Sequence, residues 1–239
     1  MEISQGIKII NTALFIKKER ILIINDLHIG YEEELHKKGI LVPRFQLKKI
    51  IEKTKKIIKK TKPNKIIING DLKHTFGKIL EREWKEILIY LEFLLENVKE
   101  VIIIKGNHDS IIKPIADKKK VKVVDNYKVR DILIIHGDEL IETDAKIIII
   151  GHEHPAITIR EKSKWEKYKC FLKGRWKNKV LIAVPSFNPL LEGTNVLEGR
   201  MLSPFLKKIN LFEVFVVGEK EIFQFGKIKE IKKMQGIEN

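Results

Sequence analysis

Short runs of Ile and Val recur along the chain and constrain its fold more than any other feature. Such runs are typical of strands that are buried on both faces of a sheet. They occupy residues 21–24, 65–68, 101–104, 132–135, 147–150 and 180–184. Between the first three runs lie two longer stretches, 47–58 and 84–98, whose apolar residues have helical spacing. This alternation predicts a βαβαβ unit with a parallel sheet in the N-terminal half.

Closely spaced strands continue from about Val121 without a long helical pattern between them. This change predicts a second sheet or an antiparallel extension. The α/β chain is therefore expected to pack two sheets together with helices outside. No Ser- or Gly-rich linker interrupts the 239 residues. We expect a single domain over residues 1–239, with residues 226–239 as a loosely ordered tail.

Composition limits the setting of the chain and its metal chemistry. No apolar run approaches the ~18 residues of a bilayer span, and no basic region followed by an apolar one opens the chain, so we expect a cytoplasmic protein without a membrane partner. The single cysteine, Cys170, excludes a thiolate cage, so any metal would be held by oxygen and nitrogen ligands. A net charge of +15 suits a polyanionic partner such as nucleic acid. Abundant Lys, Glu and Ile are equally typical of adaptation to high temperature, and both explanations stay open.

Five of the predicted strands end in Asp, Asn or His. The segments that follow them are Asn25 to His28, Asn69 to His74, Lys105 to Asp109, His136 to Asp138 and Gly151 to His154. Six of the seven histidines of the chain lie in these segments. Ligands of open α/β sheets bind beyond the carboxyl ends of the strands. We therefore expect the five segments to converge on one cleft.

Each segment alone is explained by a helix cap or a turn. Together, so many imidazoles and carboxylates would be costly to desolvate and would repel one another when protonated. Bound cations offset that cost. Seven such groups are too many for one ion but suit two ions that share a carboxylate, and these ligand types suit manganese, iron, zinc or magnesium. Two ions roughly 3.5–4 Å apart can activate water and hold the oxygens of a phosphate.

The motifs Asp-x-His, Gly-Asp-x-x-His, Gly-Asn-His-Asp, His-Gly and Gly-His-x-His, in this order, resemble those of the calcineurin-like metallophosphoesterase superfamily. The resemblance covers residues 21–154 firmly and the remainder loosely. It implies a sandwich of two mixed β-sheets flanked by helices, and two ions. One ion would be held by Asp26, His28, Asp71 and His154, and the other by Asp71, Asn107, His136 and His152, with Asp71 as the bridge.

The same resemblance implies roles for residues that hold no metal. His108 would stabilise the developing charge or protonate the leaving oxygen, and Asp109 would orient it. The residues after Asp71 resemble the SbcD nuclease branch, which makes His74 a candidate substrate-binding residue. Later segments, 170–176 and 185–188, are similar to small SbcD-related phosphoesterases associated with DNA ligase. The chain is too short for the DNA-capping domain and the ATPase-binding segment of full SbcD nucleases, which puts processive resection of duplex ends in doubt.

We predict a phosphodiesterase that uses two divalent ions, with manganese favoured over iron, zinc, nickel, cobalt and magnesium, and that acts as a nuclease on single-stranded or flapped DNA. Lys173, Arg175 and Lys177 alternate with aromatic residues and are predicted to hold the strand. A hairpin with one buried aromatic face is the alternative explanation of that segment. Two other functions remain open, namely a small-molecule phosphodiesterase or phosphomonoesterase and an inactive scaffold.

Overall fold

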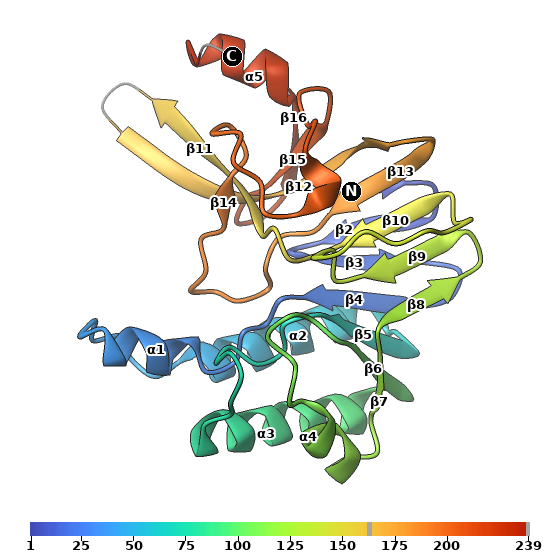
Figure 1. Cartoon of the computed structure of the whole chain (residues 1–239), viewed down its shortest axis with the longest axis vertical. Helices are drawn as coiled ribbons and strands as arrows, with labels where there is room; N and C mark the ends of the chain where they lie inside the picture. Colours follow the sequence, from blue (N-terminus) through green and yellow to red (C-terminus); the bar gives the residue numbers. More distant parts are fainter. Residues whose placement is uncertain (162–163, 238–239) are drawn as a thin grey trace.

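Two β-sheets stack face to face in the computed structural model, which describes residues 1–161 and 164–237 (Figure 1). The first sheet has the order β1-β2-β3-β4-β5-β6-β7. Strands β4 to β7 run parallel, and the strands before them pair antiparallel. The strands are β1 (Glu2–Ser4), β2 (Ile7–Ile10), β3 (Ala13–Ile16), β4 (Ile21–Asn25), β5 (Lys65–Asn69), β6 (Glu100–Ile104) and β7 (Lys122–Val124).

The second sheet has the order β14-β11-β12-β13-β10-β9-β8, with β15 paired to β12 and β16 paired to β15. Strands β9, β10 and β13 run parallel, and β8 and β12 flank them antiparallel. The predicted pair of mixed sheets is therefore confirmed. The strands are β8 (Asn126–Val129), β9 (Ile132–Ile135), β10 (Ile147–Ile150), β11 (Pro155–Glu161), β12 (Lys164–Trp176), β13 (Lys179–Ala183), β14 (Thr194–Asn195), β15 (Glu213–Val217) and β16 (Ile222–Lys227).

The Ile and Val runs are apolar on both faces because each sheet is covered on both sides. In β4, Leu22 and Ile24 face the outer helices, while Ile23 faces the second sheet. The layer between the sheets is built largely of isoleucine. From the first sheet it takes Ile23, Ile67 and Ile102, and from the second Ile134, Ile149 and Ile182.

Helices cover the outer faces of the sandwich (Figure 1). The two long helices, α2 (Gln46–Thr61) and α3 (Glu81–Asn97), pack on the first sheet through a buried cluster that includes Ile50 and Ile87. The remaining helices are α1 (Tyr31–Lys37), α4 (Lys113–Lys118), α5 (Ile228–Met234) and the 3-10 helix η1 (Pro204–Leu206). No helix in the described ranges is long and apolar enough to cross a membrane.

The C-terminal segment differs from the loosely ordered tail expected from residue 226. Residues 226–227 complete β16, and α5 follows directly. Its side chains Ile228 and Ile231, three residues apart on one face of the helix, are buried against the second sheet. This apolar pair fixes a segment that is otherwise rich in lysine.

Candidate metal centre

The carboxyl ends of five strands meet at one edge of the sandwich. Strands β4, β5 and β6 are parallel in the first sheet, and β9 and β10 are parallel in the second. The register aligns Asn25 with Asn69, and Ile135 with Ile150, so the loops after these strands begin at the same level. The two sheets are tied together there, because Nδ2 of Asn69 donates to the carbonyl of Ile135 at 2.8 Å.

The first group of ligand-type side chains comprises Asp26, His28, Asp71 and His154, whose donor atoms lie within 4.8 Å of one another. Nε2 of His28 lies 3.3 Å from Nε2 of His154 and 3.6 Å from Oδ2 of Asp71. Oδ2 of Asp26 lies 3.5 Å from Nε2 of His154. The imidazole nitrogens and carboxylate oxygens therefore face one small volume. These four residues are the set that the family resemblance implies for one ion.

The second group comprises Asp71, His136 and His152, again within 4.8 Å. Nε2 of His136 lies 3.4 Å from Oδ2 of Asp71 and 3.2 Å from Nδ1 of His152. Asn107 belongs to the same group, since its Oδ1 lies 2.9 Å from Nε2 of His136. All seven residues predicted as metal ligands are thus brought together. Asp71 is shared by the two groups, and its Oδ2 stands between His28 and His136.

The backbone of this site is unusual. Left-handed φ angles of 42° to 60° occur at five of the candidate ligands, which are Asp26, His28, Asp71, His152 and His154. A residue with a Cβ atom adopts this conformation at a cost, and clusters of such residues are a mark of functional sites. The loops are therefore held in shapes that aim the side chains inward, and the surrounding fold must supply the energy.

Three glycines let the loops approach the ligands closely. A Cβ atom on Gly70 would lie 1.9 Å from Nδ1 of His136, and one on Gly106 would lie 2.2 Å from Oδ1 of Asp71. A Cβ atom on Gly151 would lie 2.6 Å from Oδ2 of Asp26. The glycines of the Gly-Asp, Gly-Asn-His and Gly-His motifs are thus required by packing against the ligand side chains.

The electrostatics of the cluster suit divalent cations. Burial raises the pKa of the Asp71 carboxyl to about 9, and the neighbouring Asp26 adds to this rise. Burial lowers the pKa of His136 to about 4 and the pKa of His28 well below its usual value. His28 and His136 are therefore neutral at pH 7 with lone pairs free, and Asp71 gives up its proton readily only to a compensating positive charge. This donor set fits divalent cations held by oxygen and nitrogen ligands.

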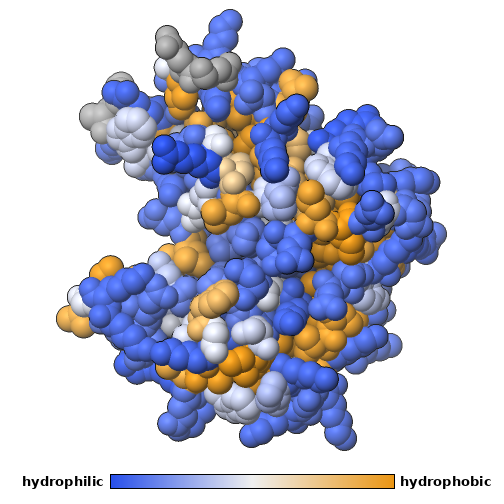
Figure 2. Space-filling view, in the orientation of Figure 1, coloured by the Kyte–Doolittle hydropathy of each residue, from blue (hydrophilic) through white to orange (hydrophobic). Residues whose placement is uncertain are grey.

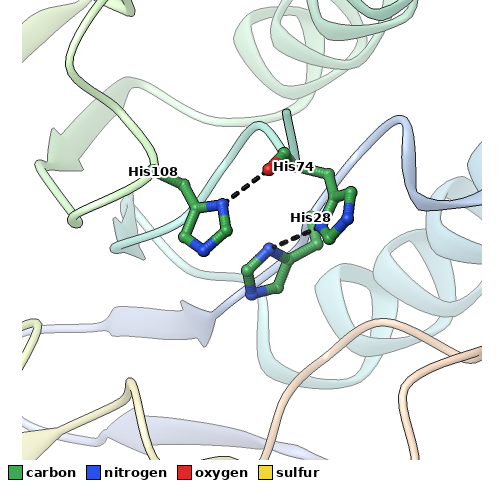
Figure 3. A group of neighbouring side chains, drawn as sticks. All are labelled: His28, His74 and His108. Carbon is green, nitrogen blue, oxygen red and sulfur yellow. Dashed lines mark hydrogen bonds between the residues drawn. The ribbon is translucent and has the colours of Figure 1, made fainter. Parts of the chain in front are cut away.

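His108 borders the cluster without joining either group of candidate ligands around Asp71. Its backbone N–H donates to Oδ1 of Asp71 at 3.0 Å, and its Nδ1 lies 2.5 Å from the carbonyl oxygen of His74. The His108 ring stands edge-on to the ring of His28, with centroids 5.0 Å apart (Figure 3). Since Nδ1 is engaged as a donor to the carbonyl, Nε2 is the nitrogen left to meet a substrate.

A family model for calcineurin-like phosphoesterases matches residues 19–208. The chain belongs to this family. Among solved structures, the nuclease MPE of Pseudomonas putida is similar at 17% identity and a TM-score of 0.63, covering 90% of this chain and 92% of that chain. The phosphoesterase Yfce of E. coli aligns at 12% identity and a TM-score of 0.41, over 88% and 93% of the two chains. No curated protein matched the sequence. Because it belongs to the calcineurin-like phosphoesterases, this phosphoesterase is a metal-dependent hydrolase of phosphate esters.

The role predicted for Asp109 does not agree with its contacts in the phosphoesterase. Among the described residues, its buried carboxylate accepts hydrogen bonds from backbone N–H groups only, those of Leu72 and Lys73 at 3.2 Å and of Gly106 at 3.1 Å. Asp109 therefore ties the loop after β5 to the loop after β6. The carbonyl of His74, rather than Asp109, fixes the ring of His108.

The lysines and arginine predicted to hold a DNA strand do not gather at the cluster. Strand β12 runs antiparallel to β13, pairing Leu172 with Ala183 but Arg175 with Val180. Since the candidate ligands follow the carboxyl ends of the neighbouring parallel strands, β12 leads away from them after Leu172. Arg175 and Lys177 therefore lie toward the opposite end of the sheet, and Lys173 lies 3.8 Å from the carboxylate of Glu213.

The aromatic residues of this segment divide into two kinds. Phe171 is fully buried between the sheets, and Trp176 packs against Phe205 with ring centroids 4.9 Å apart. Trp165 is 63% exposed near the start of β12, and the Arg160 guanidinium lies 5.0 Å from its ring centroid. Phe171 and Trp176 therefore serve packing, as the alternative explanation of a buried aromatic face predicts. The exposed ring of Trp165 remains available for stacking.

Sequence reasoning missed the residues that hold the ligand loops from behind. The hydroxyl of Ser186 donates to the carbonyl of Asp26 at 2.7 Å, and Nδ2 of Asn188 lies 3.4 Å from the carbonyl of His28. Nζ of Lys169 donates to the carbonyl of Ser186 at 2.7 Å. Glu83 binds the N–H of His74 at 2.7 Å from the first turn of α3. The only available signal was the polar segment directly after β13, which resembled the strand-end pattern of the other motifs.

Proposed function

We propose that this phosphoesterase binds two divalent ions and hydrolyses the phosphodiester bonds of single-stranded or flapped DNA. Asp26, His28, Asp71 and His154 would hold one ion, and Asp71, Asn107, His136 and His152 the other. Manganese is the favoured ion, with iron, zinc, nickel, cobalt and magnesium as alternatives. When bound, such ions polarise the phosphate and make water a stronger nucleophile at neutral pH.

One observation carries the two-ion proposal. The carboxylate of Asp71 belongs to both groups of candidate ligands, and its Oδ2 lies at comparable distances, 3.6 and 3.4 Å, from one imidazole of each group. A single ion would leave part of the seven-residue set without a partner in a buried site, at considerable cost. Two ions that share Asp71 employ every member of the set.

His108 is the proposed catalytic histidine. Its Nδ1 is engaged with the carbonyl of His74, so the ring is oriented and Nε2 is the nitrogen that would face a bound phosphate ester. Burial lowers the pKa of His108 below the usual value of a histidine, hence its protonated form becomes less abundant as pH rises through the acidic range. Protonated His108 would donate the proton on Nε2 to the leaving oxygen, whereas the neutral ring, which keeps its proton on Nδ1 for the carbonyl of His74, would offer only a lone pair at Nε2.

The proposal of a DNA substrate rests on the β11–β12 hairpin, which begins at Pro155, directly after His154. Cross-strand pairing places Arg160 opposite Trp165, Thr158 opposite Lys167 and Ala156 opposite Lys169, so these side chains share one face. Lys169 anchors the inner end of this face to Ser186, behind Asp26. We call the distal part, formed by Arg160, Trp165 and Lys167, the outer hairpin face.

The outer hairpin face extends outward from the ligand cluster. Trp165 is four residues beyond Lys169, which corresponds to about 13 Å along an extended strand. An exposed aromatic ring beside cationic side chains is suited to stacking a base and neutralising a phosphate. Figure 2 shows a hollow between this upper part of the molecule and the part below it that contains α1. A flexible single strand can follow such a hollow more easily than a stiff duplex.

The direct test compares substrates across metals. Metal-free protein should be inactive, and Mn²⁺ should restore cleavage of single-stranded and flapped oligonucleotides and of bis(p-nitrophenyl) phosphate. A blunt duplex of the same sequence should be cut more slowly, and p-nitrophenyl phosphate, a monoester, should be the weakest of the chromogenic substrates. Cleavage of chromogenic esters without cleavage of any oligonucleotide would leave the hydrolase intact and remove the nuclease proposal.

A cavity of about 560 Å³ favours a second candidate function, a small-molecule phosphodiesterase. It adjoins the candidate ligands Asn107 and His136, and its lining includes the carboxylates of Asp125, Asp138 and Glu139. A pocket of this size accommodates a small organic group, and its acidic lining repels a second phosphate. Hydrolysis of small diesters far faster than of oligonucleotides would favour this candidate.

A further inference from the structure

Glu34, His74 and His28 form a continuous line of contacts that ends at the candidate metal ligands. Nδ1 of His28 lies 3.3 Å from Nδ1 of His74, and Nε2 of His74 contacts the carboxylate of Glu34 from α1. Figure 3 shows the rings of His28 and His74 turned toward one another. The line passes from solvent into the core, because the side chains of Glu34, His74 and His28 are 38%, 11% and 4% exposed.

The proton positions along this line follow from one requirement. If Nε2 of His28 offers its lone pair toward Asp71 and His154, the neutral ring carries its proton on Nδ1. That proton needs an acceptor, and the atom facing it is Nδ1 of His74. His74 then carries its own proton on Nε2, where the Glu34 carboxylate accepts it. Every nitrogen has one role, and the opposite tautomer of His74 would set two N–H groups against each other.

We propose that Glu34 and His74 act as positioning residues that fix the tautomer and orientation of His28 as a metal ligand. The inference rests on the proposed function in one respect, which is that His28 holds an ion. Carboxylate partners of metal-bound histidines raise the basicity of the ligand and hold its ring in place. Here the carboxylate acts through a second histidine.

This assignment changes the role of His74, which the sequence suggested as a substrate-binding residue. Both ring nitrogens of His74 are engaged, one with His28 and the other with Glu34. The backbone is engaged too, since the N–H of His74 donates to Glu83 and its carbonyl accepts from His108. His74 therefore orients the ligand histidine with its ring and the catalytic histidine with its carbonyl. A direct contact with a substrate would require one of these bonds to break.

Metal binding tests the positioning role of Glu34 and His74 independently of turnover. Co²⁺ and Mn²⁺ would be titrated by calorimetry into chelator-treated wild-type protein and into the variants Glu34→Ala, His74→Leu and His74→Asn. Glu33→Ala is the matched control, because Glu33 lies on the same helix and pairs with Arg44 at 3.7 Å instead. The tautomer of each histidine would be read from ¹⁵N chemical shifts of the Zn²⁺-loaded protein.

The expected result is a loss of roughly 10- to 100-fold in affinity for one of the two ions in Glu34→Ala and His74→Leu, the usual effect of removing such a partner. His74→Asn should recover much of this loss, because its amide oxygen can accept the proton of His28 where Nδ1 stood. Glu33→Ala should bind both ions as the wild type does. In the wild type, His74 should carry its proton on Nε2.

Three outcomes would overturn the positioning role of Glu34 and His74 while leaving the proposed function intact. The first is wild-type affinity for both ions in Glu34→Ala and His74→Leu. The second is a His74 proton on Nδ1 in the Zn²⁺-loaded protein. The third is an additional equivalent of metal bound by His28, His74 and His108, since the nitrogens would then be ligands. Failure of the wild type to bind two ions would instead contradict the proposed function.

Discussion

Oδ2 of Asp71 lies 3.4 Å from Nε2 of His136, while the other oxygen of Asp71 accepts the backbone N–H of His108. One oxygen thus faces the ligand cluster and the other is anchored by the protein. Asp71→Ala should therefore remove both ions and all hydrolysis, because neither group of ligands is complete without this carboxylate. Metal analysis after desalting checks the result. Asp125→Ala, which removes an exposed carboxylate from the neighbouring cavity, should retain two equivalents. Two equivalents in Asp71→Ala would contradict the shared ligand.

Metal affinity should rise with pH up to about pH 9. The pKa of Asp71 is raised to about 9, so the metal-free carboxyl holds a proton below that pH and an entering ion must displace it. His28 and His136 are already neutral near pH 7 because their pKa values are lowered, and they contribute no competing proton. Between pH 7 and 8.5 affinity should rise by about tenfold per pH unit. Calorimetry in buffers of different ionisation enthalpy should detect about one released proton, and no release would contradict the assignment.

Replacement of His108 should separate substrates by their leaving groups. His108→Ala should retain both ions but lose roughly 10²–10⁴ in turnover on a diester with an alkyl leaving group. The defect should shrink for p-nitrophenol, which leaves without a proton. In the wild type, the ratio of the alkyl rate to the nitrophenyl rate should fall as pH rises, because His108 with its lowered pKa loses its proton. An equal defect for both leaving groups would show that His108 stabilises charge instead of donating a proton.

Asp109 should contribute to stability more than to chemistry. Its buried carboxylate accepts three backbone hydrogen bonds, and Asp109→Ala leaves those N–H groups without a partner. The free energy of unfolding should fall by about 3 kcal/mol. Chemical denaturation of the metal-free protein measures this loss. Any fall in turnover should be the same for good and poor leaving groups, and a selective loss on poor leaving groups would restore the orienting role.

The outer hairpin face should matter for DNA and not for small diesters. The double variant Arg160→Ala/Trp165→Ala should weaken binding of single-stranded DNA, with about 1–3 kcal/mol for a lost stacking contact. The slope of log affinity against log salt should decrease by about 0.7 for one lost phosphate contact. Hydrolysis of bis(p-nitrophenyl) phosphate should be unchanged. Arg175→Ala/Lys177→Ala is the control, because it removes two cations at the far end of the sheet. A larger effect of this control on DNA binding would show that the DNA lies at that end instead.

Much of the site could be predicted from the sequence because parallel strands impose a simple geometry. Asp26, Asp71 and Asn107 each follow a buried run of the first sheet, and the register of β4, β5 and β6 brings their loops to one level. No detailed knowledge of side-chain packing was needed to bring them together. The same argument applies to His136 and His152 in the second sheet.

Other features depend on pairings that a local pattern does not contain. The position of Arg175 is set by the antiparallel register of β12 against β13, and a long strand carries its residues away from the site. Two of the three partners of Asp109 are backbone groups of a loop more than thirty residues earlier in the chain. The strands β1 to β3 are only three or four residues long, too short to show a clear period. α5 is fixed by two isoleucines within a lysine-rich segment.

The left-handed backbone of the ligand loops has an evolutionary consequence. Apart from glycine, the residues that adopt this conformation most readily are Asn, Asp and His, and these are also the residues that bind hard and borderline metal ions. The left-handed backbone and the metal-binding role therefore favour the same three residue types at these positions, which are Asp26, His28, Asp71, His152 and His154. Most substitutions at these positions lose the loop conformation and the metal ligand at once. Exchanges among Asn, Asp and His keep the loop conformation and alter only the ligand. Descendants of this chain would therefore change their metal preference most easily by exchanges among Asn, Asp and His at these five positions.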